Sequence, residues 1–169
     1  MQDMKRSFIN NKPMTVITAD IAKYNGFEEV LGYDNAQKAI SDIAEGFMFM
    51  NRVLKLGAEM YYLGRGSYRV ILDEKHYDKA VETAEVISNA SKSNEKLKRM
   101  GIIPKTYVCI IRCPDDIRDF ESLIALENSI SKTEYTGKVL YAGDILKNSR
   151  YDLMKNIDNI LENALKNNK

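Results

Sequence analysis

Cysteine and histidine, which often act as nucleophiles, bases or metal ligands, are rare in this 169-residue chain. The chain has two cysteines, Cys109 and Cys113, and one histidine, His76. Two thiols in or beside one apolar run, with a single imidazole, make neither a disulfide framework nor a zinc site. Free thiols are typical of a reducing compartment, so we expect a cytoplasmic protein. Carboxylates and glycine-rich turns are the other places where chemistry can occur.

Two positions of that kind stand at the ends of predicted strands. Asp20 ends an apolar, β-branched run that begins at Met14. An aspartate in such a place often serves as a cap or turn residue, and its oxygens are also of the kind that bind Mg²⁺. The second position is the turn Gly64-Arg-Gly-Ser67, whose glycines tolerate the positive φ that a hairpin requires. We expect these glycines to serve the backbone of the turn.

Composition and charge argue against several classes of protein. Hydrophobic residues make up 44% of the chain and charged residues 29%, which argues against disorder. With 25 basic and 24 acidic residues the net charge is +1, and no segment clusters Lys and Arg with aromatic residues, so nucleic acid is not an expected partner. No apolar stretch approaches the roughly 20 residues that span a bilayer, so we expect no membrane contact in this segment.

Hydrophobic periodicity predicts the elements that must position these residues. Helical and strand patterns follow one another in the order β-α-β-β-α-β-α-β. The predicted strands are 14–19, 60–63, 68–72, 105–113 and 138–141, and the predicted helices are 35–56, 80–90, 119–132 and 144–169. This order predicts an α+β fold, an α/β sandwich in which helices flank a central, mostly antiparallel sheet.

The order of elements and two motifs resemble a GGDEF domain, the fold of bacterial diguanylate cyclases. The run from Asp20 to Gln37 aligns without a gap with the family's Asp-Ile-Asp-x-Phe-Lys pattern and the residues after it. The signature hairpin corresponds to Tyr61 to Tyr68, so that Gly64-Arg-Gly-Ser-Tyr68 stands in place of Gly-Gly-Asp-Glu-Phe. The resemblance implies a nucleotidyl cyclase or palm-like fold, with a degenerate GGDEF domain in residues 1–141.

The resemblance also implies that the family's reaction is impaired. That reaction joins two GTP molecules with the help of divalent metals, which carboxylates must hold. Asp20 keeps a metal-binding position, whereas Gly66 and Ser67 replace the hairpin's acidic residues. No catalytic residue is expected to be intact at the signature positions, which are Gly64, Arg65, Gly66, Ser67 and Tyr68. Mg²⁺ together with GTP is the one cofactor that the resemblance implies.

Residues that correspond to the family's nucleotide contacts are altered as well. Glu28 and Gln37 stand where the family reads guanine, and both can still hydrogen-bond a base. Arg65 adds a cation that can take over part of the metal's charge on a phosphate. The expected nucleotide-binding residues are Asn25, Glu28, Gln37, Arg65, Lys132 and Lys138, although the two lysines also suit a solvated surface. The family's product-inhibition motif falls on Lys55-Leu-Gly-Ala58, which keeps one charge and lacks the aspartate.

An apolar stripe from Leu153 to Leu165 predicts a helix in residues 142–169, after the end of the resemblance. In many relatives such a helix leads to an EAL phosphodiesterase domain, so the resemblance implies a linker and an EAL partner, with homodimerisation as a second mode of regulation. We therefore predict an inactive regulatory domain of cyclic di-GMP signalling. Two alternatives are a residual metal-dependent diguanylate cyclase that uses Asp20, Glu28 or Glu29, and a structural spacer.

Overall fold

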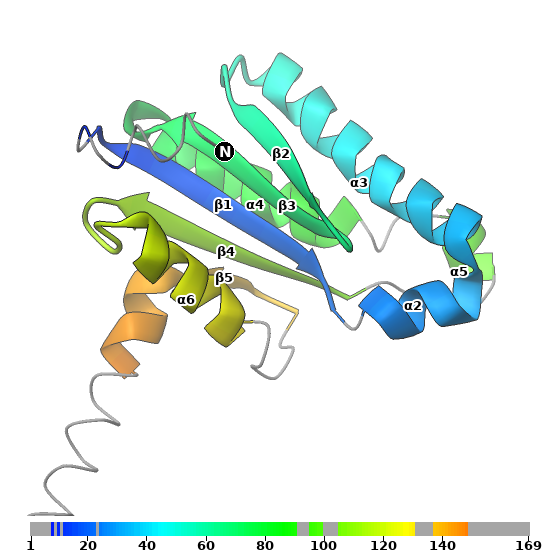
Figure 1. Cartoon of the computed structure of the whole chain (residues 1–169). Coiled ribbons are helices and arrows are strands. Elements are labelled where there is room, and N and C mark those ends of the chain that lie inside the picture. Colours follow the sequence, from blue (N-terminus) through cyan, green and yellow to red (C-terminus); the bar gives the residue numbers. More distant parts are fainter. Residues whose placement is uncertain are drawn as a thin grey trace, which may run out of the picture.

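A five-stranded sheet forms the centre of the molecule, in the order β2-β3-β1-β4-β5 (Figure 1). The computed structural model describes residues 8, 10, 12–22, 24–90, 95–99, 105–130 and 137–148. The strands are β1 (Met14–Ile21), β2 (Glu59–Gly64), β3 (Ser67–Asp73), β4 (Thr106–Cys113) and β5 (Val139–Tyr141). Every neighbouring pair is antiparallel except β4 and β5, which are parallel. The predicted α+β class and mostly antiparallel sheet are confirmed.

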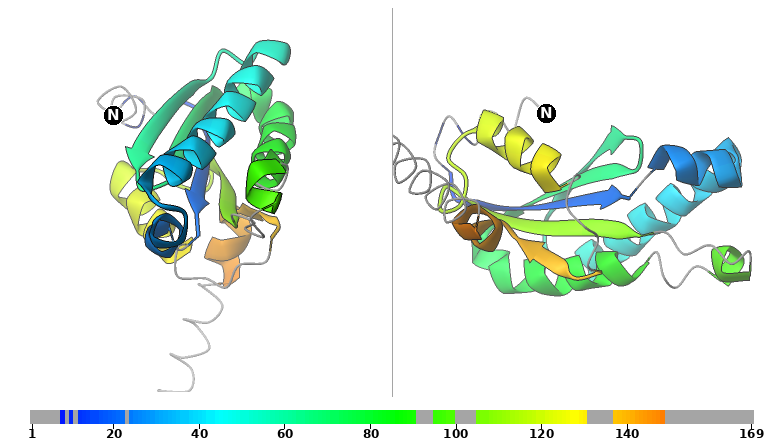
Figure 2. Two further views of the ribbon diagram at one scale, coloured as in Figure 1. Left: turned by 90° about the vertical axis from the view of Figure 1, so that its right-hand side faces the viewer. Right: turned by 90° about the horizontal axis from the view of Figure 1, so that it is seen from below.

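Helices cover both faces of the sheet. The helices are α2 (Tyr24–Leu31), α3 (Tyr33–Val53), the short 3-10 helix η1 (Glu74–His76), α4 (Tyr77–Ala90), α5 (Glu95–Arg99) and α6 (Phe120–Ile130), and residues 142–148 are also helical. Figure 2 shows α3 and α4 on one side of the sheet and α6 on the other. No helix among the described ranges is long and apolar enough to cross a membrane.

The central strand β1 explains why its sequence is almost continuously apolar. Ile17, Ala19 and Ile21 belong to the core under α3 and α4. Met14 and Val16 belong to the second core, under α6. A strand buried on both faces needs apolar side chains in both directions. Because side chains alternate along a strand, Asp20 shares the α6 side of the sheet with Met14 and Val16.

The helices between β1 and β2 differ from the predicted single helix at 35–56. Two helices occupy this region, and they meet at Gly32, whose φ of +74° lies in the left-handed region. The short α2 was missed because it is only eight residues long and contains Gly26, although its apolar residues have helical spacing. At the other end, α3 stops at Val53, and Asn51 exchanges two hydrogen bonds of 3.0 Å with the backbone of Ala58. These bonds fix the loop that leads into β2.

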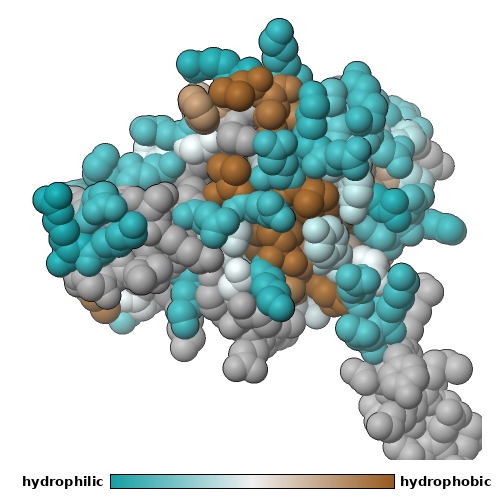
Figure 3. Space-filling view, turned by 180° about the vertical axis from the view of Figure 1, so that it is seen from behind, coloured by the Kyte–Doolittle hydropathy of each residue, from teal (hydrophilic) through white to brown (hydrophobic). Residues whose placement is uncertain are grey.

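The face of the molecule that carries α3 and α4 has apolar residues that are accessible to solvent. Figure 3 shows a band of hydrophobic residues on the side of α4, bordered by hydrophilic ones. Three large apolar side chains near the end of α3 are more than half exposed, namely Met48 (55%), Phe49 (62%) and Val53 (55%). Exposed apolar groups that lie close together favour contact with another protein.

Part of the predicted C-terminal helix lies outside the described residues. The helical stretch 142–148 overlaps its beginning, and the stripe from Leu153 to Leu165 falls among residues that the structure does not describe. The division of the chain after residue 141 therefore stays a prediction, as does the role of 142–169 as a linker.

Candidate functional site

The tip of the β2–β3 hairpin is a tight two-residue turn. Gly64 pairs with Ser67, and between them Arg65 and Gly66 have φ angles of 50° and 74°. Two successive positive φ values are typical of the turns that suit the twist of a hairpin. Arg65 is exposed at this tip, so its cation is available to solvent next to the ends of β1 and β3. The predicted backbone role of Gly64 and Gly66 is confirmed.

Gly66 is enclosed by side chains. A Cβ atom on Gly66 would lie 2.9 Å from the Cδ2 atom of Tyr24 and 3.0 Å from the Cβ atom of Ile21. The Gly66 carbonyl also accepts a 3.1 Å hydrogen bond from the backbone N–H of Ile21, which holds the tip against the end of β1. An acidic side chain therefore has no room at this position unless Tyr24 or the turn moves.

Asp20 and Ser67 face each other across the β1–β3 ladder. The Ser67 hydroxyl donates a hydrogen bond to Oδ1 of Asp20. Burial raises the pKa of Asp20, while the bond from Ser67 and the charge of Arg69 act in the opposite direction. Asp20 is thus a partly buried carboxylate that already has a hydroxyl partner.

Replacing Asp20 by asparagine should make stability less dependent on pH. Because the folded-state pKa of Asp20 is raised, the folded state holds its proton more tightly than the unfolded state. The contribution of Asp20 is therefore most favourable below its ordinary pKa and is lost as pH rises through the raised value. Asp20→Asn keeps an acceptor for Ser67 without the charge, so we expect a gain in the free energy of unfolding that is larger at pH 7 than at pH 5.

Urea unfolding at pH 5 and pH 7 measures this effect. Asp42→Asn, at a partly exposed position on α3, is the matched control and should change stability by less than about 0.5 kcal/mol. A loss of stability at pH 7 in Asp20→Asn would show that the charge of Asp20 is favourable in the folded state.

The two predicted base-reading residues meet at one tyrosine. Nε2 of Gln37 donates to the hydroxyl oxygen of Tyr24 at 3.2 Å. Burial raises the pKa of Tyr24, and the charge of Glu28 together with a hydrogen bond between the two side chains raises it further. Gln37 on α3 and Glu28 on α2 are thus brought together, with the Tyr24 hydroxyl between them. Their role in reading a base stays a prediction.

Tyrosines from the hairpin complete this region. The ring centroids of Tyr62 and Tyr68 are 5.1 Å apart, and the Tyr68 hydroxyl donates to the Ile40 carbonyl at 2.7 Å. Burial raises the pKa of Tyr68. Tyr68 is a packing residue, whereas Tyr62 remains 48% exposed.

The remaining predicted contacts lie apart from Tyr24 or outside the described residues. Asn25 is exposed on α2. Lys138 directly precedes β5, whose first residue, Val139, pairs with Val108 of β4. The neighbouring β4 residue, Tyr107, pairs with Asp20 of β1. Lys138 therefore lies at the same end of the sheet as Asp20, with β4 between them. Lys132 is not among the described residues.

A buried ion pair that the sequence did not predict lies beside Asp20. Arg69 follows Tyr68 on β3 and is only 2% exposed. Its Nε donates to Oε1 of Glu127 at 2.9 Å, and its Nη2 donates to Oε2 of the same carboxylate. Burial raises the pKa of Glu127, Arg69 lowers it, and the charge of Asp20 raises it. A charged residue inside the apolar runs of both β3 and α6 was the signal that could have revealed this pair.

The residues at the hairpin end do not fit a divalent metal. Within the ranges that the structure describes, no three His, Cys, Asp or Glu side chains are grouped so that they could hold one. Asp20 already accepts a hydrogen bond from the Ser67 hydroxyl. The charged residue next to this pair in the β1–β3 ladder is Arg69, which is a cation. Mg²⁺ prefers several oxygen ligands with negative charge, so a lone carboxylate beside a guanidinium is a poor site.

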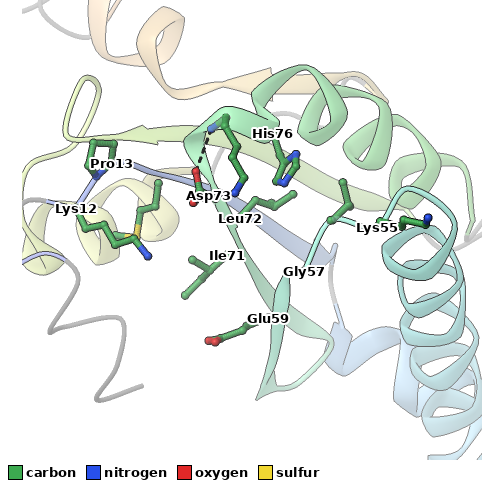
Figure 4. Close-up of a pocket in the computed structure, with 12 residues that line it drawn as sticks. Lys12, Pro13, Lys55, Gly57, Glu59, Ile71, Leu72, Asp73 and His76 are labelled. Carbon is green, nitrogen blue, oxygen red and sulfur yellow. Dashed lines mark hydrogen bonds and ion pairs between the residues drawn. The ribbon is translucent and has the colours of Figure 1, made fainter.

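A pocket of about 440 Å³ lies at the opposite end of the sheet, where β1 begins and β3 ends (Figure 4). Its lining includes Lys12, Lys55, Lys75 and His76. Asp73 is in the same lining, where a hydrogen bond from the backbone N–H of Lys75 lowers its pKa and the two side chains are 3.7 Å apart. Lys55 of the altered product-inhibition motif thus belongs to the lining of a pocket that also contains Glu59 and Asp73, far along the sheet from Asp20.

The fold is that of GGDEF domains. No protein-family model matches the sequence, and no curated protein is significantly similar to it. The active GGEEF domain of a diguanylate cyclase from Vibrio cholerae superposes with a TM-score of 0.59 at 15% identity, covering 83% of this chain and 90% of that one.

Two further solved structures agree with this assignment of the fold. A GGDEF domain from Pseudomonas aeruginosa gives a TM-score of 0.65 at 15% identity, with 83% and 86% of the two chains covered. A domain of an EAL/GGDEF domain protein from M. capsulatus gives 0.60 at 13% identity, with 82% and 92% covered. The palm-like fold that the resemblance implied is confirmed, and these low identities carry no information about activity.

Proposed function

We propose that the chain is a catalytically inactive GGDEF-type domain that regulates a partner in cyclic di-GMP signalling. The observation that carries this proposal is the closed hairpin tip, where Gly66 has no carboxylate and no room for one beside Tyr24 and Ile21. The cyclase reaction requires metal ions to neutralise phosphates and to activate the attacking oxygen. Asp20 already accepts a hydrogen bond from Ser67 and lies near the guanidinium of Arg69, so this site is poorly suited to binding those metal ions.

Binding of GTP without turnover is compatible with the same geometry. Glu28 and Gln37 offer an acceptor and an amide at the place where the resemblance expects guanine, and Arg65 offers an exposed cation. The Tyr24 hydroxyl competes for these two side chains in the absence of ligand. A bound nucleotide therefore has to replace an internal hydrogen bond, which weakens its affinity.

Replacing Tyr24 by phenylalanine should strengthen the binding of GTP. The change removes the hydroxyl that occupies Gln37 and Glu28 and keeps the ring that packs against Gly66. One hydrogen bond has a net value of about 1 kcal/mol, so the affinity should rise severalfold, to about tenfold at most. Isothermal titration calorimetry with GTP and Mg²⁺ measures it, and Tyr33→Phe, at a side chain that is 63% exposed, is the control.

Regulation of an attached domain is the second part of the proposal. The exposed apolar residues of α3 supply a surface through which a partner can be controlled. An EAL phosphodiesterase domain is the partner that the resemblance implies, and one structural relative comes from an EAL/GGDEF protein. A ligand of this domain can change the partner's activity only if it binds with different affinity to the active and the inactive conformation of the two-domain protein.

The phosphodiesterase activity of the full-length protein, with and without GTP, tests this part. The proposal expects the rate of cyclic di-GMP hydrolysis to change with GTP and this change to disappear when residues 12–148 are deleted. An unchanged rate in both comparisons, with no heat of GTP binding to the isolated domain, would favour the structural spacer instead.

A further inference from the structure

A buried guanidinium lies on the α6 side of the sheet, at the hairpin end. Arg69 in β3 is almost fully buried, and its planar head group donates two hydrogen bonds to the two oxygens of Glu127 on α6. The Cζ atom of Arg69 is also 5.7 Å from the centroid of the Phe120 ring. This two-point contact fixes the position of the charge, which a lysine in the same place would not do.

Asp20 is a second carboxylate within reach of the same charge. In the β1–β3 ladder Thr18 stands opposite Arg69, and Asp20 stands opposite Ser67. Residues on one face that are diagonal across a ladder are close enough for long side chains to interact. The pKa values agree with this placement, because Arg69 lowers that of Asp20 and Asp20 raises that of Glu127. Two carboxylates therefore share one guanidinium, with a net charge of one negative unit when both are ionised.

We infer that Arg69 is the internal cation of this sheet end, and that its guanidinium, rather than a divalent metal, balances Asp20 and Glu127 and ties α6 to the hairpin. A guanidinium keeps its charge at all ordinary pH values and cannot be removed by a chelator. The folded state of this region is then independent of metal ions. The inference does not depend on the proposed function, because it concerns charge balance and not nucleotide binding or regulation.

Removal of the guanidinium should convert the cluster into a metal site. Arg69→Met leaves Asp20, Glu127 and the Ser67 hydroxyl on one face, an oxygen set with two negative charges of the kind that Mn²⁺ binds. We expect this variant to melt on the order of 10 °C lower than the wild type in EDTA. Millimolar Mn²⁺ should recover part of that loss, because an ion that binds only the folded state stabilises it.

Thermal unfolding with EDTA or Mn²⁺ tests the inference on four proteins. The wild type and Arg112→Met, which removes a half-exposed arginine from β4, should show no change with Mn²⁺. The double variant Arg69→Met/Glu127→Gln has one carboxylate fewer and should also show none, although it should fold more stably in EDTA than Arg69→Met.

Two results would overturn the inference. One is a rise in the melting temperature of the wild type with Mn²⁺ that Asp20→Asn abolishes, since a metal would then bind beside Arg69. The other is the absence of any Mn²⁺ effect on Arg69→Met. If that variant is unfolded in EDTA, its near-ultraviolet circular dichroism should return with Mn²⁺, and failure to return counts against the inference equally.

Discussion

Replacing Gly66 by aspartate is expected to destabilise the domain by about 2–5 kcal/mol and to create no cyclase. The φ of +74° at Gly66 costs an L-residue about 1–2 kcal/mol. The added Cβ, 2.9 Å from the Tyr24 ring and 3.0 Å from Ile21, adds roughly 1–3 kcal/mol of overpacking. Restoring an acidic residue at the signature position is therefore not enough to restore the metal site.

Urea unfolding and chromatographic analysis of GTP reactions measure both parts of this expectation. Gly57→Asp is the matched control, because Gly57 also has a positive φ, of +58°, but no atom within 4 Å of the added Cβ. We expect Gly57→Asp to cost only the backbone part, about 1–2 kcal/mol. Equal stability of the two variants would mean that the hairpin tip is not closed and has room for a carboxylate.

Truncating Glu127 to alanine is expected to cost about 3–5 kcal/mol, because it leaves the guanidinium of Arg69 buried without its carboxylate. The unsatisfied donors, and a buried charge that only Asp20 then offsets, both raise the free energy of the folded state relative to the unfolded chain. The loss should persist in high salt, since screening by ions acts mainly on exposed charges.

Chemical denaturation of two companion variants isolates the contribution of the buried charge. Glu121→Ala removes an exposed glutamate from the same helix and should change stability by less than about 0.5 kcal/mol. Arg69→Met/Glu127→Leu removes both charges and should recover most of the loss, because an apolar replacement of a buried pair is often neutral. A loss below about 1 kcal/mol for Glu127→Ala would indicate that water reaches the guanidinium.

Local sequence patterns predicted most of the sheet because its strands are marked by composition. β1 and β4 are apolar, β-branched runs, and the glycine-rich turn between Tyr62 and Tyr68 separates two such runs. The resulting order of strands and long helices limited the fold to few arrangements. The short α2 was missed because it spans only eight residues and contains Gly26, which lowers the helix propensity of the segment.

The candidate site was predicted less completely, for a physical reason. Alignment with the GGDEF pattern placed Asp20, Glu28 and Gln37 near the hairpin, and the structure brings Glu28 and Gln37 to Tyr24. The spacing of residues in the sequence does not reveal which hydrogen-bond or ion-pair partner a polar side chain has in the folded protein. Arg69 and Glu127 are 58 residues apart, so their pairing depends on how α6 packs on the sheet.

Formation of cyclic di-GMP from GTP by the purified domain is the most direct test of its proposed inactivity. The domain is incubated with GTP and Mg²⁺ or Mn²⁺, and the nucleotides are separated by chromatography beside an active diguanylate cyclase. We expect GTP to remain unconverted while calorimetry of the same sample reports whether it binds. Metal-dependent appearance of cyclic di-GMP would contradict the account, because Asp20 and its neighbours would then support catalysis without a hairpin carboxylate.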